Sequence, residues 1–225
     1  MAKEHTDRQY AQELQNLKDE ILKMGGKIEE MIIKSIEALV RRDSELAEKV
    51  IATDEEVDGF ERDIDAACFK ILALRQPIAS DLRFIATTLK IVTDLERIGD
   101  MAVNIAERAL ELNKEPELKP YIDIPRMAAE IEKMIKDCLD AFVWSNPELA
   151  EDVCKRDDFI DNLNDQIFRE VLTFMMEDPK TISRGMRVIF ISKYLERIAD
   201  HTTNIAQMVI FMVKGEDIRH LDFED

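Results

Sequence analysis

Apolar residues recur at intervals of three and four along nearly the whole chain, and Pro or polar capping residues separate the apolar runs. This spacing matches the helical period of about 3.6 residues, so it predicts an all-α protein. Candidate helix caps are Asp43 and either Ser80 or Asp81, while Pro147 suits a first helical turn and Asp178-Pro179 a break. The predicted helices cover residues 8–41, 44–75, 79–113, 124–144, 147–177 and 181–214.

The sequence contains an internal repeat, which fixes the architecture. LERIGDMAVNIAE, from Leu95, aligns with LERIADHTTNIAQ, from Leu195, at an offset of 100 residues. Upstream, DSELAEKVIATDEEVD from Asp43 aligns with NPELAEDVCKRDDFID from Asn146 at an offset of 103, so a three-residue length difference falls near Pro77. Each copy therefore supplies three helices.

Long helices joined by short connections run antiparallel to their neighbours and pack as bundles. We therefore predict two tandem three-helix bundles, six long helices related by internal duplication. The first repeat covers residues 1–116 and the second 117–225, with the linker at 113–125. Gly25-Gly26 inside the first helix predicts either a kink or a close contact between helices.

Composition and charge exclude several classes of function. The 48 acidic and 31 basic residues give a net charge of −17, which argues against nucleic-acid binding. The amino terminus lacks the features of a secretory signal, and no apolar run approaches the roughly 18 residues of a membrane span, so we expect a cytoplasmic protein without membrane insertion. Cys68, Cys138 and Cys154 lack paired spacing, which indicates reduced, mostly buried thiols.

Four pairs of acidic residues are spaced four apart, which places both members of each pair on one face of a helix. Asp54 projects beside the apolar positions Val50 and Val57, so we expect it to face another helix. Glu96 and Asp100 lie at the edge of an apolar stripe, where they can reach both a neighbouring helix and solvent. The pairs are Asp54 with Asp58, Glu96 with Asp100, Asp157 with Asp161, and Glu196 with Asp200.

Two interpretations of these pairs stay open. They can form a solvated charged face with salt bridges to Arg97, Arg197 or nearby lysines. Alternatively they bind metal, because oxygen-only ligand sets suit hard or borderline cations such as magnesium, manganese, calcium or iron. The repeat keeps all four pairs while Glu61 and Asp65 become Asn164 and Phe168, and this selective retention favours metal. His201, which has Met101 as its counterpart, is a possible extra ligand.

Methionines concentrate in the second copy, at Met175, Met176, Met186 and Met208. Methionine fills irregular gaps in cores and also serves adaptable binding surfaces. We interpret these four residues as core.

Several motifs together resemble the PhoU family: LRQPIASDLR from Leu74, DLERIGD from Asp94, YLERIADH from Tyr194 and GEDIRH from Gly215. The resemblance covers nearly the whole chain. It implies two three-helix bundles whose E/D-x-x-x-D motifs bind multinuclear metal clusters, most often of iron and otherwise of zinc, manganese or magnesium. Carried over by position, Asp54, Asp58, Glu96 and Asp100 form the first site, and Asp157, Asp161, Glu196 and Asp200 form the second.

The resemblance also implies a function. PhoU-type proteins are cytoplasmic negative regulators of phosphate uptake and of the phosphate regulon. They connect the ATPase of the Pst phosphate transporter with a sensor histidine kinase, and they act as homodimers. On this basis the chain is expected to be a regulator and not an enzyme.

Two alternatives remain at the level of sequence. One is a PhoU-like paralogue that regulates another phosphate carrier. The other is a carboxylate-bridged dinuclear metalloenzyme, but the ferritin-like version needs a Glu-x-x-His motif on each of two helices. His5, His201 and His220 are the only histidines, and none stands in such a motif.

Overall fold

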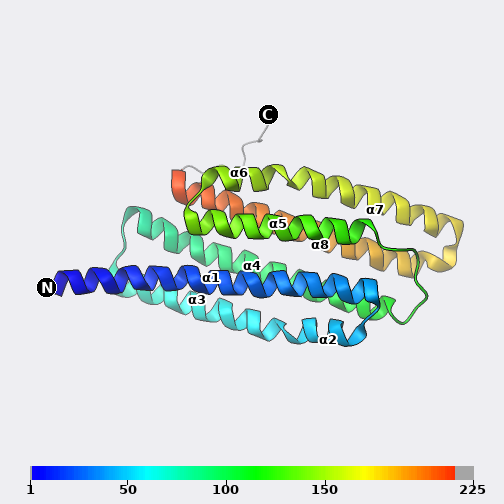
Figure 1. Ribbon diagram of the computed structural model, residues 1–225, viewed down its shortest axis with the longest axis horizontal. Helices are drawn as coiled ribbons and strands as arrows, with labels where there is room; N and C mark the ends of the chain where they lie inside the picture. The colour runs from blue at the N-terminus through cyan, green and yellow to red at the C-terminus, as the bar shows by residue number, and fades with distance from the viewer. Residues whose placement is uncertain (1, 216–225) are drawn as a thin grey trace.

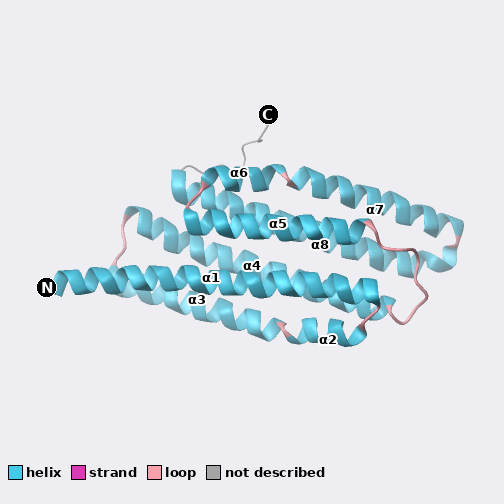
Figure 2. Ribbon diagram, in the orientation of Figure 1, coloured by secondary structure: helices cyan, strands magenta, loops and turns pink. Residues whose placement is uncertain are grey.

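The computed structural model describes residues 2–215, with side chains from residue 8 onward, and this part of the chain is helical without strands (Figures 1 and 2). His220 and most of the GEDIRH motif lie outside the described residues, as does the side chain of His5. No described helix is both long and apolar enough to cross a membrane. The elements are α1 (Ala2–Arg41), α2 (Ser44–Ala52), α3 (Asp54–Arg75), α4 (Ala79–Leu112), α5 (Asp123–Trp144), α6 (Pro147–Lys155), α7 (Asp157–Glu177), the short 3₁₀ helix η1 (Pro179–Thr181) and α8 (Ile182–Lys214).

The predicted helices are all present, but the prediction that the second helix of each copy is continuous is wrong. It breaks at Thr53 in the first copy and at Arg156 in the second, where single residues separate α2 from α3 and α6 from α7. Both breaks have the same hydrogen bonds: the Thr53 and Arg156 amides donate to the carbonyls of Val50 and Val153, three residues back, at 3.0 and 3.2 Å. The tighter i→i−3 bond interrupts the α-helical ladder without any Pro or Gly, so the sequence carries no breaker to reveal it.

The caps repeat as well. The Asp43 carboxylate accepts from the Leu46 amide at 3.0 Å, which confirms the predicted cap of α2. Its counterpart Asn146 caps α6 in the same way, through the Leu149 amide at 3.1 Å. The prediction of Ser80 or Asp81 as the cap of α4 is wrong: Ile78 holds that position and provides no side-chain hydrogen bond.

The two bundles share one continuous hydrophobic core. The third helices, α4 and α8, lie against each other along the middle of the molecule, with α1 to α3 on one side and α5 to α7 on the other (Figure 1). Equivalent residues of both copies are fully buried in this core, among them Leu95 with Leu195 and Ile98 with Ile198. The duplication thus builds a pseudo-symmetric molecule whose centre is the α4–α8 pair.

The methionine prediction is only half right. Met175 and Met208 are partly buried against the core. Met176 and Met186 instead lie on the surface, with 76% and 40% of their area exposed. They face solvent because their positions on α7 and α8 lie outside the apolar arc of each helix.

Of the two predictions for Gly25-Gly26, the structure supports a close contact between helices. A Cβ added at Gly25 would stand 2.2 Å from Leu139 Cδ1 on α5, whereas one added at Gly26 would meet nothing within 4 Å. Leu139 is 4% exposed, so it has little room to move. Gly25 therefore lets α1 of the first copy approach α5 of the second.

Replacing each glycine by alanine tests this contact. Gly26→Ala should stabilise the protein by about 1 kcal/mol, because alanine favours the helix more than glycine. Gly25→Ala gains the same propensity but must displace Leu139, an overpacking cost of roughly 1–3 kcal/mol. Denaturant unfolding should therefore show Gly25→Ala to be the less stable variant; equal stabilities would mean that the two helices do not pack this closely.

Candidate functional site

The second copy brings its four predicted carboxylates together between α7 and α8. Asp157 is the first residue of α7 and Asp161 lies one turn later, while Glu196 and Asp200 project from α8. Burial raises the pKa of Asp157 to about 7, and repulsion from Asp200, Asp161 and Glu196 adds to the rise. The same causes, burial first and then Glu196, raise the pKa values of Asp161 and Asp200. The four side chains thus form one group of mutually repelling charges.

Two oxygen atoms of this group are buried without a hydrogen-bond partner among the described residues, namely Asp157 Oδ1 and Glu196 Oε2. Leaving a buried polar atom unsatisfied costs roughly 1–3 kcal/mol, and more for a charged group. The nearby Lys193 satisfies only the other oxygen of Glu196, with Nζ 2.5 Å from Oε1. A salt-bridged surface therefore accounts for part of the cluster and leaves its inner oxygens without a positive partner.

The first copy repeats the arrangement between α3 and α4. Burial raises the pKa of Asp54, the first residue of α3, and repulsion from Asp58 and Asp100 adds to it. Burial also raises the pKa of Glu96, and Asp100 contributes further. The positively charged side chain of Arg97 makes only loose contacts with this group, at 3.6 Å from Glu96 and 3.9 Å from Asp100.

One residue that the repeat comparison set aside belongs to the first group. Burial raises the pKa of Glu61, which lies on α3 one turn after Asp58 and also repels Glu96. Its counterpart Asn164 is a neutral amide whose Oδ1 accepts from the Ser192 hydroxyl at 2.8 Å. The two clusters are therefore not identical. Glu61 could have been found from the sequence, because the first copy continues its acidic spacing beyond Asp58. A search restricted to the pairs that both copies share discards it.

The arrangement offers carboxylate oxygens to a cation, but the side chains are not placed around a common point. Among the described residues, no three His, Cys, Asp or Glu side chains are grouped so that they could hold a metal ion. Like charges repel, and without a cation each carboxylate is more stable when it points away from the others. The donor set fits a metal in two respects: it offers only hard oxygen ligands, and two of its oxygens are buried without a partner.

His201, considered above as an extra ligand, contacts Asp94 and none of the eight predicted ligands. Its Nδ1 lies 2.8 Å from Asp94 Oδ1, across the boundary between α8 and α4. This contact joins the two copies. It uses the histidine that has no equivalent in the first copy.

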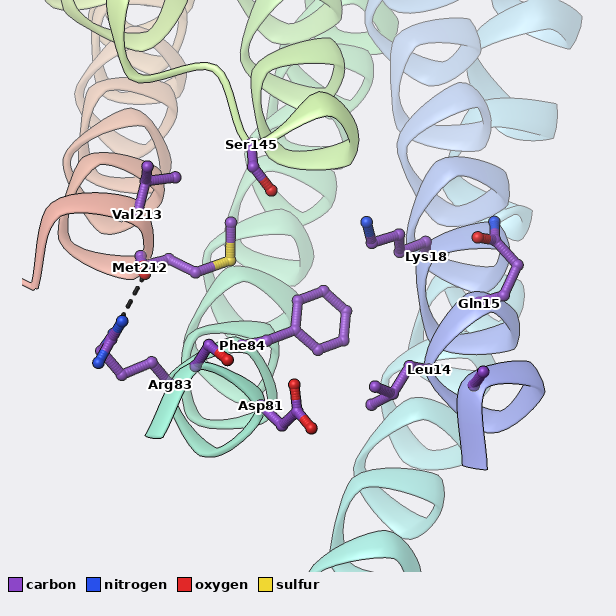
Figure 3. Close-up of a pocket in the computed structure, with 11 residues that line it drawn as sticks. Leu14, Gln15, Lys18, Asp81, Arg83, Phe84, Ser145, Met212 and Val213 are labelled. Atoms are coloured by element: carbon purple, nitrogen blue, oxygen red, sulfur yellow. Dashed lines mark hydrogen bonds between the residues drawn. The ribbon is translucent and has the colours of Figure 1, made fainter. Parts of the chain in front are cut away.

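A separate cavity of about 450 Å³ lies at one end of the molecule, lined by α1, the start of α4, the α5–α6 turn and the end of α8 (Figure 3). Its two cations bind backbone carbonyls of the second copy: Lys18 Nζ donates to Val143 O at 3.1 Å and Arg83 Nε to Met212 O at 3.2 Å. Asp81, predicted as a cap, accepts instead from the Tyr10 hydroxyl at 3.1 Å. The cavity contains none of the predicted site residues, and its two cations join the two copies.

The fold and the clusters define a class: tandem three-helix bundles with a group of half-buried carboxylates on the last two helices of each copy. Comparison with known families gives the particular family. The model of the PhoU domain matches the chain twice, over residues 21–109 and 124–209. The chain belongs to the PhoU family.

Similar proteins match over nearly their full length. A protein from Pseudomonas aeruginosa described as a phosphate-specific transport system accessory protein PhoU homolog is 41% identical over 218 residues, 96% of this chain and 90% of that protein. A Caulobacter vibrioides protein of the same description is 43% identical over 216 residues, 96% of this chain and 94% of that one.

Solved structures agree with the fold. The crystal structure of PhoU from Pseudomonas aeruginosa has a TM-score of 0.88 at 41% identity, covering 92% of this chain and 100% of that one. The phosphate transport system regulatory protein PhoU from Streptococcus pneumoniae has a TM-score of 0.85 at 29% identity, with coverage of 92% and 98%. The prediction of the family and of two tandem bundles is therefore confirmed.

The raised pKa of Asp157 predicts a pH-dependent stability in metal-free protein. The folded chain keeps this proton up to about pH 7, whereas the unfolded chain releases it near the ordinary value of 3.8. Protonation between these values stabilises the folded state, and this contribution is lost as the pH rises through 7. Asp157→Asn should remove that loss and make the metal-free protein more stable than wild type at pH 8.

Asp158→Asn is the matched control, because Asp158 is the next residue of α7 and is exposed. It removes one charge from the same helical turn, and because Asp158 makes the smallest contribution to the raised pKa of Asp157, it should leave most of the pH dependence of wild type in place. Urea unfolding in chelator at several pH values measures all three proteins. Parallel profiles for wild type and Asp157→Asn would contradict the account of a buried, repelled carboxylate.

Proposed function

We propose that this chain is an accessory regulator of phosphate transport that carries metal ions on its two carboxylate clusters. It acts in the cytoplasm as a negative regulator of phosphate uptake and of the phosphate regulon. In this role it is a homodimeric adaptor between the ATPase of the Pst phosphate transporter and the sensor histidine kinase. Its work is binding, not catalysis.

The family supports the transport role. The relatives named above are described as accessory proteins of a phosphate-specific transport system or as its regulatory protein, and the chain matches 90% or more of their lengths. This coverage supports assigning to the chain the transport role for which those relatives are described.

The metal proposal rests on one observation, the two buried oxygens of Asp157 and Glu196 that have no hydrogen-bond partner in the described structure. A bound cation would satisfy these oxygens and offset the repulsion that raises the pKa of Asp157. Iron is the first candidate, with zinc, manganese or magnesium as the others. The proposed ligands are Asp54, Asp58, Glu96 and Asp100 in the first cluster and Asp157, Asp161, Glu196 and Asp200 in the second.

Metal would act here by joining helices. Each cluster takes two carboxylates from α3 or α7 and two from the helix that follows it, α4 or α8. A shared ion would therefore tie α3 to α4 and α7 to α8. It would also replace an area of negative potential with a neutral or positive one. Binding that depends on the folded arrangement stabilises the protein by mass action.

Elemental analysis of protein purified without chelator tests the proposal. We expect several metal ions per chain in wild type. The double variant Asp157→Asn with Asp161→Asn should lose the share held by the second cluster, because it removes both carboxylates that α7 contributes. When chelator is added, the melting temperature of this variant should fall less than that of wild type.

The control removes two charges from the same helix at residues that are not among the proposed ligands and that contribute least to the raised pKa of Asp161. Asp158→Asn with Asp165→Asn should keep the metal content of wild type, since Asp158 is exposed and the Asp165 side chain is 71% exposed. Equal metal loss in both double variants would mean that metal follows net charge. Wild-type protein without metal would leave the carboxylates as a charged face.

A further inference from the structure

A small cavity of about 70 Å³ lies between α1 and the break that separates α2 from α3, where these helices run side by side (Figure 1). Three of the side chains that line it are lysines and one is a glutamate, a local excess of positive charge on a chain whose net charge is −17. We call it the lysine cavity, and its polar lining residues are Lys27, Glu30, Lys34, Lys49 and Thr53.

The second copy of the repeat places the opposite charges at the equivalent positions. Each of the three lysines corresponds to an acidic residue, and the glutamate corresponds to a lysine. The neutral threonine corresponds to an arginine. At the offset of 103 residues the equivalent pairs are Lys27 and Glu130, Lys34 and Asp137, Lys49 and Asp152, Glu30 and Lys133, and Thr53 and Arg156.

The second copy balances its three acids with a cation of its own, the guanidinium of Arg156. Its Nη2 donates to Asp137 Oδ2 at 2.6 Å. Its Nη1 lies 3.5 Å from Glu130 Oε1, and its Nε lies 3.3 Å from Asp152 Oδ2. One side chain at the break between α6 and α7 therefore contacts all three carboxylates.

The first copy has no such central partner for its three lysines. Thr53 occupies the break between α2 and α3, but its side chain is short and uncharged. Its hydroxyl already donates to the carbonyl of Lys49 at 2.8 Å. Because the charges are reversed here, the counter-ion that would take the place of Arg156 is an anion, and residue 53 does not supply one.

Two carboxylates from the chain compensate this charge only in part. Glu30 pairs with Lys34 and lies 3.6 Å from Lys27, while Glu56 on the exposed side lies 2.9 Å from Lys27. Lys49 forms no ion pair with any residue that the structure describes. The lining of the cavity thus keeps three positive charges against one negative charge.

The volume of the cavity limits the size of the anion. A water molecule takes about 30 Å³ in the liquid, so a cavity of about 70 Å³ admits an inorganic ion of a few heavy atoms. Organic ligands occupy pockets of about 300–1,000 Å³ and are too large. The occupant that fits is a small oxyanion, whose oxygens accept charge-assisted hydrogen bonds from lysine ammonium groups.

Glu30 favours phosphate over sulfate as that oxyanion. Phosphate keeps at least one proton at neutral pH, and its protonated oxygen can donate a hydrogen bond to a carboxylate. Sulfate carries no proton, so it would only be repelled by the negative charge of Glu30. An ionised carboxylate accepts up to about four hydrogen bonds, so Glu30 can accept this one and keep its lysine partners.

We propose that the lysine cavity binds inorganic phosphate. Lys27 and Lys34 on α1 and Lys49 on α2 donate to its oxygens, and Glu30 accepts from its protonated oxygen. The bound ion joins α1 to α2 directly before Asp54, the residue that begins α3. This site is separate from the carboxylate clusters and goes beyond the proposed function, because it requires neither their metal nor a transport partner.

Isothermal titration calorimetry with inorganic phosphate tests the proposal, on protein stripped of metal by chelator so that phosphate cannot bind to metal ions. Lys34→Gln with Lys49→Gln should raise the Kd for phosphate more than tenfold, because it removes two of the three charged donors. The control, Lys23→Gln with Lys90→Gln, removes two exposed lysines that do not line the cavity and should change the Kd less than twofold. Sulfate at the same ionic strength should bind wild type at least tenfold more weakly than phosphate.

A single variant covers the case in which the double variant does not fold. Lys49→Gln changes an exposed side chain without an ion pair among the described residues, so it should keep the melting temperature of wild type and still raise the Kd severalfold. Wild type that binds no phosphate would overturn the proposal and leave the proposed function untouched. An equal rise of Kd in both double variants would overturn it too, since phosphate would then respond to net charge, and sulfate binding as tight as that of phosphate would contradict the role of Glu30.

Discussion

Repulsion among half-buried carboxylates is the constraint on which this structure depends. In each copy of the repeat, two acidic residues from one helix meet two from the next, and burial together with repulsion from the others raises the pKa values of Asp54 and Asp157. A folded chain tolerates such a group only if the rest of the bundle offsets its cost. The positions that begin α3 and α7 show the conflict most clearly, because Asp54 and Asp157 are held at the start of each helix and turned toward its neighbour.

The offset comes from the shared core. The α4–α8 pair runs through the middle of the molecule, and both copies pack their apolar residues against it, so neither bundle has to stabilise its acidic group alone. Close contacts such as Gly25 against Leu139, and the bonds of Lys18 and Arg83 to backbone carbonyls, join the copies further. Each carboxylate cluster lies between an outer helix, α3 or α7, and one helix of the central α4–α8 pair.

Sequence patterns were sufficient for the repeat, for the extent of most helices and for the same-face spacing of each acidic pair, because helical period and duplicated spacing are local properties. They were insufficient for the breaks at Thr53 and Arg156, which arise from a change in hydrogen-bond partner that neither residue type specifies. They also missed Glu61, whose role depends on a neighbouring helix, and the exposure of Met176 and Met186, since apolar type alone does not tell a core residue from a surface one. These features belong to tertiary packing.

Anomalous diffraction from crystals of protein purified without chelator would test the central claim most directly, because it locates metal by position. The account predicts anomalous peaks between α3 and α4 and between α7 and α8, within bonding distance of the acidic pairs. Anomalous peaks elsewhere would contradict it. So would crystals without any metal between these helices, in which Glu196 pairs with Lys193 and Glu96 with Arg97.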